Sequence, residues 1–343
     1  MRITFFTALL YSASLFAQQP ITGQQPEALF AEARARFDRA LYSSAYEHFG
    51  LVRSMVPEAS DWSEQSMYYQ ALCSIRLLHR DAEEYAESFL QTYPSSSRRI
   101  DLILEAAEQS FNRRRYQEAK RWLRQLDGVD LASGLRAEVQ FKLGYAHFLL
   151  NELDQAKAEL GEAKKSKSPV AKTAQYYYGH IAYLEKSDQT ALENLEPLQN
   201  HEEFGAVVPY YLAQIFARQG KDDELLKLGE GLIKKASAKR APEIALLVAQ
   251  SMFRKKRYAD AIPYFEFNGA QGGRVSPEIS YQMGVCAYQT KDYEGAIRAF
   301  NQLPNENTTD WLVQSRLMLG DSYARLERWE EAQSAFRSIA LSK

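Results

Sequence analysis

The sequence predicts an all-α protein built as a solenoid of about nine helix-turn-helix repeats. The 343-residue chain holds 44 Ala against 11 Val, and abundant alanine with few β-branched residues favours helices over sheets. A small residue followed four positions later by a bulky apolar one also recurs every 34 to 37 residues. Self-similarity at such a period is typical of stacked repeats.

The composition excludes several classes of protein. With 45% hydrophobic residues, 25% charged residues and a net charge of −2, the chain is neither wholly disordered nor a polytopic membrane protein. A pI near 6.3 argues against a general nucleic-acid binder, which would be basic. Two cysteines cannot form a disulfide scaffold.

The N-terminus predicts a Sec-type signal peptide over residues 1–17. Met1 and Arg2 form a basic start, an uncharged apolar run covers residues 3–16, and Ala17 precedes a polar stretch. The run is shorter than the roughly 20 residues of a membrane-spanning helix, although an uncleaved anchor is the alternative. Residues 18–26 are predicted to be a polar tether. We expect an exported protein with no membrane span after cleavage.

The remaining residues, 27–343, are predicted to form the repeat array. Its second helices align on Ala45, Ala82, Ala119, Ala156, Ala191, Leu225, Ala261, Ala296 and Ala332. Its first helices carry a small residue at Ala33, Ala107, Gly144, Gly179, Ala213, Ala249, Gly284 and Gly320. Two repeats depart from the pattern: the second has Gln70 at the small position, and the sixth has Leu225 with Gly229 after it. These two repeats are expected to pack irregularly.

Three segments carry a resemblance to a known family. LGYAHFLLNELDQAKAEL begins at Leu143, MGVCAYQTKDYEGAIRAF at Met283 and LGDSYARLERWEEAQSAF at Leu319. Their Leu/Met-Gly pair, aromatic positions and Ala-x₃-Leu/Phe spacing resemble the tetratricopeptide repeat. The resemblance implies a right-handed superhelical solenoid of antiparallel helix pairs, with a concave groove that binds proteins.

A second resemblance concerns the compartment. The segment YYQALCSIRLLHRDAEEYAESFLQTYP, from Tyr68, is similar to the N-terminal arrays of long exported repeat proteins of Bacteroidetes-type bacteria. Together with the signal peptide, it predicts a periplasmic protein, or one held at the outer membrane through a partner.

Several prolines mark the starts of first helices. Pro26, Pro169, Pro242 and Pro277 fit the first helical turn, where the missing N–H costs nothing. Ser168 and Ser276 precede two of them and are predicted to be N-caps.

No enzyme signature is present. Five His are scattered, and His201-Glu202 lacks the second histidine of a zinc-protease helix. Cys73 and Cys286 are predicted to be buried free thiols. We expect no catalytic residue, no metal site and no cofactor.

The family's groove positions carry many aromatic residues. Positions 5, 9 and 12 of first helices line the groove in this family, and here they predict a partner-binding surface. Its members are Phe141, Tyr145, Phe148, Tyr176, His180, Tyr183, Tyr210, Phe253, Tyr281 and Tyr288, with Arg218, Arg254 and Arg325 at the rim. Aromatic side chains are enriched at binding hot spots. The alternative is that part of this stripe is core between helices.

The function predicted from these features is a non-catalytic exported scaffold in envelope assembly or secretion. Its partner is expected to be a peptide or helical segment of an envelope protein, and not nucleic acid; the oligomeric state stays open. The alternatives are a glycan- or peptidoglycan-binding module, or a non-catalytic arm of a larger protein. Phe336, Ile339 and Leu341 are expected to lack a following neighbour, which indicates a truncated array or a docking end, with an adequate cap as the alternative.

Overall fold

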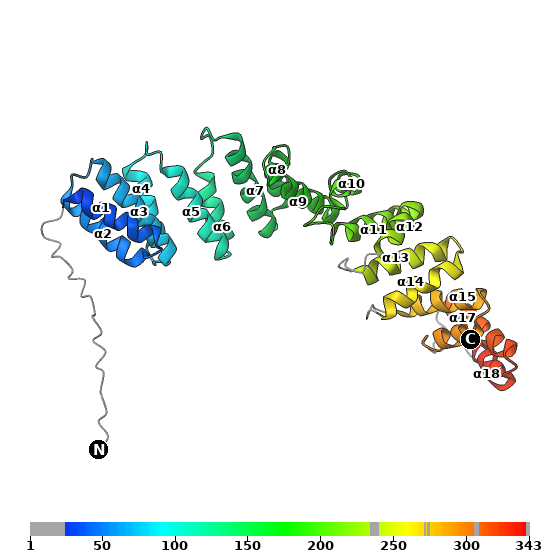
Figure 1. The fold of residues 1–343 in the computed structure, drawn as a ribbon. Helices are drawn as coiled ribbons and strands as arrows, with labels where there is room; N and C mark the ends of the chain where they lie inside the picture. The colour runs from blue at the N-terminus through cyan, green and yellow to red at the C-terminus, as the bar shows by residue number, and fades with distance from the viewer. Residues whose placement is uncertain (1–24, 234–239, 271, 273–274, 305–308, 341–343) are drawn as a thin grey trace, which may run out of the picture. The chain divides into compact units, whose positions relative to one another are not determined.

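The computed structural model describes residues 25–233, 240–270, 272, 275–304 and 309–340. The predicted signal peptide, nearly all of the tether, and Leu341 lie outside these ranges. The described residues belong to two compact units, Met1–Asp130 and Leu131–Lys343. Every regular element that the structure describes is a helix, which confirms the predicted all-α class (Figure 1).

The first unit contains three consecutive helix pairs. Its helices are α1 (Pro26–Asp38), α2 (Tyr42–Met55), α3 (Asp61–Leu77), α4 (Ala82–Thr92), α5 (Arg99–Asn112) and α6 (Tyr116–Arg124). Each pair is one predicted repeat, and consecutive pairs stack against each other.

The second unit continues with six pairs. Its helices are α7 (Ser133–Leu149), α8 (Leu153–Ala163), α9 (Ala171–Leu184), α10 (Asp188–Leu195), the short 3₁₀ helix η1 (Glu196–Leu198), α11 (Val208–Gln219), α12 (Asp222–Ile233), α13 (Ala241–Arg254), α14 (Tyr258–Ala270), α15 (Pro277–Gln289), α16 (Tyr293–Phe300), α17 (Asp310–Arg325) and α18 (Trp329–Ala340).

Small residues allow the two helices of a repeat to pack closely. All nine aligned second-helix residues are buried, as are the small residues of the first helices. A Cβ on Gly284 would lie 2.4 Å from Phe300, and one on Gly144 would lie 2.6 Å from Leu160. The bulky residue four positions after the aligned alanine therefore occupies the space that the missing side chain leaves.

The turn inside each repeat is held by backbone hydrogen bonds. In the fourth repeat, Glu152 N–H donates to the carbonyl of His147 at 2.9 Å, and Asn151 adopts a left-handed conformation with φ of 60°. The other eight repeats have the same bond and one left-handed residue, which is glycine only at Gly220. This is the Schellman arrangement, which satisfies carbonyls at the end of a first helix.

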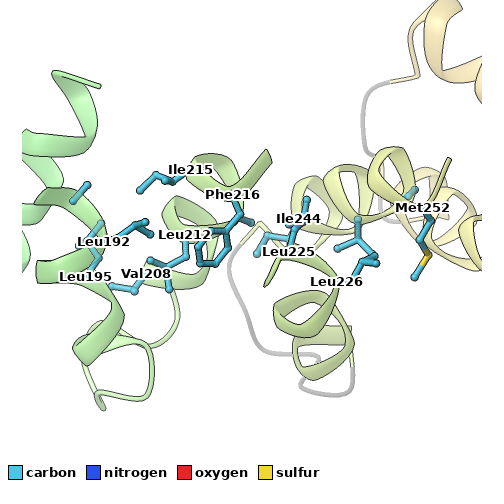
Figure 2. Packing of buried hydrophobic residues seen from close by; sticks show 14 of the residues in the cluster. Leu192, Leu195, Val208, Leu212, Ile215, Phe216, Leu225, Leu226, Ile244 and Met252 are labelled. Carbon is cyan, nitrogen blue, oxygen red and sulfur yellow. The ribbon is translucent and has the colours of Figure 1, made fainter. Parts of the chain in front are cut away.

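In the sixth repeat, the large and the small residue of the second helix have exchanged positions. Leu225 is buried where the other repeats have alanine, and Gly229 follows where seven of the other eight have Leu or Phe. A Cβ on Gly229 would lie 2.2 Å from Cγ2 of Val248, so the next repeat fills that space. The surrounding core joins residues of α10 to α13, as Figure 2 shows.

One of the two predicted serine caps is present. Ser276 Oγ accepts a hydrogen bond from Ile279 N–H at the start of α15. The prediction for Ser168 was wrong, because α9 begins at Ala171 and no side chain caps it. Two further residues lie between Ser168 and the helix, so Ser168 is too far from its first turn.

The last described repeat exposes apolar side chains. Phe336 is 41% exposed and Trp329 is 66% exposed. Ile339 is half-buried.

Candidate functional site: an aromatic cluster on three first helices

Aromatic side chains follow one face of α7 and one face of α9. Helix α7 places Phe141, Tyr145 and Phe148 at spacings of four and three residues. Side chains spaced in this way share one face of a helix. Helix α9 repeats the spacing with a second set, Tyr176, His180 and Tyr183.

Tyr177 connects the rings of α7 to those of α9. Its centroid lies 4.9 Å from that of Tyr145 and 5.3 Å from that of Phe148. Phe148 also lies 5.7 Å from His180. These separations fall within the 4.5–7 Å range typical of favourable aromatic pairs.

Tyr211 makes the equivalent connection between α9 and α11. Its ring lies 4.9 Å from His180, 4.9 Å from Tyr183 and 5.6 Å from Tyr210. At the other end of α9, Tyr176 stacks on Phe204 at 4.4 Å with the ring planes 6° apart. We give the name aromatic cluster to the connected rings of α7, α9 and α11 together with Phe204: Phe141, Tyr145, Phe148, Tyr176, Tyr177, His180, Tyr183, Phe204, Tyr210 and Tyr211.

The aromatic cluster is only partly covered by the protein. Phe204 is buried, and the other nine residues are half-buried. Packing against neighbouring repeats hides one side of these rings, and the rest of their surface meets solvent. The same rings therefore contribute both to the core between repeats and to the solvent-exposed surface. The alternative prediction, that part of this stripe is core between helices, is thus correct for the covered side of the rings.

Burial favours the neutral forms of three members of the cluster, His180, Tyr176 and Tyr177. It lowers the pKa of His180 below 6.5, because the charged imidazolium is poorly solvated among rings. It raises the pKa of Tyr176 and Tyr177 far above 10, and hydroxyl contacts with Tyr211 and Tyr145 add to the shift.

Two exposed leucines lie beside the cluster in the sequence. Leu149 and Leu184 directly follow Phe148 and Tyr183 at the C-terminal ends of α7 and α9. Leu184 is 50% exposed and Leu149 is 36% exposed. These two leucines add exposed apolar surface at the ends of the helices that carry the cluster.

Three predicted groove residues pair with other rings. Phe253 pairs with Tyr258, Tyr281 with Trp311, and Tyr288 with Tyr293. Tyr288 also donates a hydrogen bond of 2.8 Å to Asp321. The ring contacts thus join seven of the ten predicted groove residues into one cluster and place these three in separate pairs of later repeats.

The three predicted rim arginines all pair with carboxylates of this chain. Arg218 forms two bonds with Asp188, and its guanidinium lies 5.4 Å above the ring of Tyr183. Arg254 contacts Asp222 at 2.6 Å, and Arg325 contacts Asp321 at 3.3 Å. Their charges are already neutralised locally.

Sequence reasoning missed the three residues that connect the cluster, Tyr177, Phe204 and Tyr211. Two of them follow a predicted groove residue directly, in the runs Tyr176-Tyr177-Tyr178 and Tyr210-Tyr211. Adjacent residues on a helix point about 100° apart, so the second tyrosine of each run reaches the preceding repeat. Consecutive tyrosines at a groove position were the available signal.

Elsewhere, the described residues form no exposed thiol and no metal-binding group. Cys73 and Cys286 are buried free thiols, as predicted, and burial raises the pKa of each to about 12. Among the described residues, no group of three or more His, Cys, Asp or Glu is placed to hold a metal ion. None of the described helices is long and apolar enough to cross a membrane.

Comparison with known proteins supports the repeat assignment. The tetratricopeptide repeat family matches residues 65–96, 278–307 and 314–341. Among curated proteins, none matches the sequence of this chain.

Several solved structures resemble the chain at low sequence identity. A tetratricopeptide repeat protein from Parabacteroides merdae is 14% identical, with 88% of this chain and 99% of that protein covered and a TM-score of 0.40. The C-terminal part of a repeat-containing protein from Cytophaga hutchinsonii is 15% identical, with coverages of 69% and 94% and a TM-score of 0.45. The structure of Naa15/Naa10 bound to HypK-THB is 13% identical, with coverages of 92% and 50% and a TM-score of 0.50. The matched repeats and the consecutive helix pairs make this chain a tetratricopeptide repeat protein.

Proposed function

We propose that this chain is an exported, non-catalytic scaffold that binds a segment of a partner protein on its aromatic cluster. The tetratricopeptide repeat fold supports a role in protein–protein interaction. The observation that carries the finer proposal is the unbroken series of ring contacts across α7, α9 and α11, formed by rings that stay half-exposed.

The chemistry of the cluster favours an apolar partner segment. Tyrosine supplies a large contact area and loses little conformational entropy, because only two side-chain torsions become fixed. His180 is neutral at pH 7, and Arg218 beside Tyr183 is already paired. A peptide or amphipathic helix with aliphatic or aromatic anchors fits this surface better than a charged tail does.

Export and a role in the envelope rest on the sequence. The basic start, the apolar run over residues 3–16 and Ala17 support secretion across the inner membrane. A periplasmic location, or one at the outer membrane through a partner, follows from that proposal.

The test is site-specific photo-crosslinking in intact cells of the native host. A photoreactive residue replaces Leu184 beside the cluster, and the control replaces Ala158, a residue of α8, the second helix of the fourth repeat. A discrete protein adduct from position 184 alone supports the scaffold. Equal adducts from both positions, or none from either, contradict it; adducts that contain cell-wall glycan instead favour the carbohydrate-binding alternative.

A matched substitution separates binding from folding. Leu184→Ser removes an exposed apolar side chain, so the free energy of unfolding should change by less than about 0.5 kcal/mol. In this variant the photoreactive residue replaces Tyr145 instead, and we expect fewer protein adducts from that position than without the Leu184→Ser substitution. Leu41→Ser is the control, because Leu41 is 52% exposed and belongs to the first unit. Equal losses for the two variants would argue against the assignment of the surface.

A further inference from the structure

A second polar site lies in the first unit, far in sequence from the aromatic cluster. A pocket of about 390 Å³ is bordered by α2, α3 and α4. Gly50, Arg53, Ser54, Ser63, Gln70 and Tyr85 are among its lining residues. Most of these side chains are polar, unlike those of the aromatic cluster.

Gln70 is the unusual residue of this pocket. It occupies the position at which the other eight repeats have alanine or glycine, and only 4% of it is exposed. Its Nε2 donates to the carbonyl of Tyr46 at 3.2 Å, which fixes the direction of the amide. Gly50 makes room for it, because a Cβ there would lie 2.9 Å from Nε2.

The fixed amide positions Arg53. Arg53 Nη1 donates to Gln70 Oε1 at 3.2 Å and to the hydroxyl of Tyr85 at 3.1 Å. Tyr85 in turn donates to Gln70 Oε1 at 3.1 Å. Two side chains, from α3 and α4, thus hold the guanidinium of Arg53 in one orientation at the pocket.

The positive charge of Arg53 has no acidic partner among the described residues. Both acceptors of Nη1 are neutral, and no carboxylate among the described residues lies within ion-pair distance of it. Its Nε is buried without a hydrogen-bond partner. A half-buried charge without an acidic partner is costly, and the two neutral acceptors offset only part of that cost.

We propose that Arg53 is the centre of a binding site for a carboxylate of a partner polypeptide. Nη1 is occupied by Gln70 and Tyr85 and Nε is buried, so Nη2 is the group of Arg53 that can donate to a carboxylate. Such charge-assisted hydrogen bonds are strong. One uncompensated positive charge matches one negative charge, whereas a phosphate monoester carries nearly two at neutral pH. Glu58 at the border of the pocket disfavours the more highly charged anion further.

Two sources can supply this carboxylate, an acidic side chain or a chain terminus. The test titrates the isotope-labelled full chain with the capped peptide acetyl-Gly-Glu-Gly-amide, with acetylglycine and with inorganic phosphate. The readouts are the Arg53 side-chain Nε–H and the backbone amides of Ser54 and Ser63 in ¹H–¹⁵N spectra. We expect saturable shifts with at least one carboxylate probe, and the tighter probe identifies the source.

The variants test the role of the guanidinium. Arg53→Gln should weaken carboxylate binding at least tenfold, and Arg53→Lys, which keeps the charge but loses the planar fork, should weaken it less. Gln70→Ala should also weaken binding, since Gln70 acts as a positioning residue. Arg80→Gln, at an exposed arginine of the same unit, is the matched control and should bind like the wild type.

Three results would overturn the proposal: no saturable shift, tighter binding of phosphate than of both carboxylates, or unchanged binding in Arg53→Gln. The inference does not depend on the aromatic cluster. Leu184→Ser should leave the titration unaltered, so failure of one site can be distinguished from failure of the other.

Discussion

At the scale of single residues, the contact between a glycine and its bulky neighbour decides how closely two helices pack. Among the repeats that follow the regular pattern, Gly284 and Phe300 make the closest contact of this kind. A methyl group added at position 284 would lie 2.4 Å from the ring of Phe300. A side chain at position 284 would have to displace that ring. The same type of substitution should therefore have opposite effects at packed and open glycines.

Gly284→Ala is expected to lower the free energy of unfolding by about 1–3 kcal/mol, because the added methyl group overpacks the core. Gly269→Ala is the control: Gly269 lies in α14 with nothing within 4 Å of the new methyl, so the helix should gain up to about 1 kcal/mol. Urea denaturation followed by circular dichroism measures both. Similar losses for both variants would contradict the packing argument.

His180 makes a prediction about pH. Its pKa is lowered by burial, so between that value and 6.5 the unfolded chain binds more protons than the folded one. The contribution of His180 to stability is therefore complete above pH 6.5 and falls as the pH drops through this window, by at most about 1.4 kcal/mol at one unit below 6.5. The loss between pH 7.5 and pH 5.5 should be smaller for His180→Gln than for the wild type. Parallel pH dependence of the two melting temperatures would show that His180 is not the group responsible.

At the scale of elements, the turn inside each repeat is set by backbone bonding more than by residue type. Eight of the nine turns place a non-glycine residue in the left-handed region, including Ala40, Arg114 and Glu327. Such conformations cost L-residues about 1–2 kcal/mol each. Helix pairing on both sides of the turn supplies the compensating stability.

Gly220 is the exception, and it tests this cost. Gly220→Ala should destabilise the chain by about 1 kcal/mol, since the methyl group strains a residue with φ of 67°. Lys186→Gly at the equivalent turn, where φ is 59°, should be close to neutral, because strain relief offsets the greater freedom of the unfolded chain. Chemical denaturation of both variants checks the pair. If Lys186→Gly destabilised the chain more than Gly220→Ala does, backbone strain at positive φ would not explain the two effects.

The sequence predicted the helix pairs well and the turns poorly. The spacing of Ala156 and Leu160 relative to Gly144 is required by the close packing of the two helices. The same spacing in the sequence therefore located both helices of a repeat. The left-handed residue gives no such signal in most repeats, because Lys186 and Glu327 are ordinary surface residue types that rarely adopt positive φ. The same limit applies to the aromatic cluster: the groove positions of the resembled family predicted Tyr145 and His180, but the rings that join adjacent repeats depend on how those repeats stack.

At the scale of the whole molecule, each unit has its own core and its own buried cysteine. Cys73 lies in the first unit and Cys286 in the second, and neither is exposed. A repeat period reports only on neighbouring elements, so it predicted the pairs and not the division after Asp130. The two thiols make that division measurable, because each one reacts only when its surroundings open.

Phe89→Ala removes a fully buried ring of α4 and should cost about 3–5 kcal/mol within the first unit. Labelling of Cys73 by a thiol reagent should then accelerate at least about a hundredfold, while Cys286 keeps its wild-type rate, because stability in repeat arrays depends on neighbouring repeats. Phe265→Ala, in the core that includes Cys286, is the matched control and should give the reverse pattern. Mass spectrometry of the labelled peptides reads both sites at once. Equal acceleration at both cysteines in either variant would mean that the chain opens as a single cooperative body.

The exchange of Leu225 and Gly229 in the sixth repeat limits how this chain can be recombined. Val248 of the seventh repeat occupies the space next to Gly229, so the packing between these two repeats depends on both residues. A chimera that replaces the sixth repeat with a regular one would bring a bulky residue against Val248 and leave a void at Leu225. Designers who shuffle modules from this array should therefore move the sixth and seventh repeats together, and cut on either side of them.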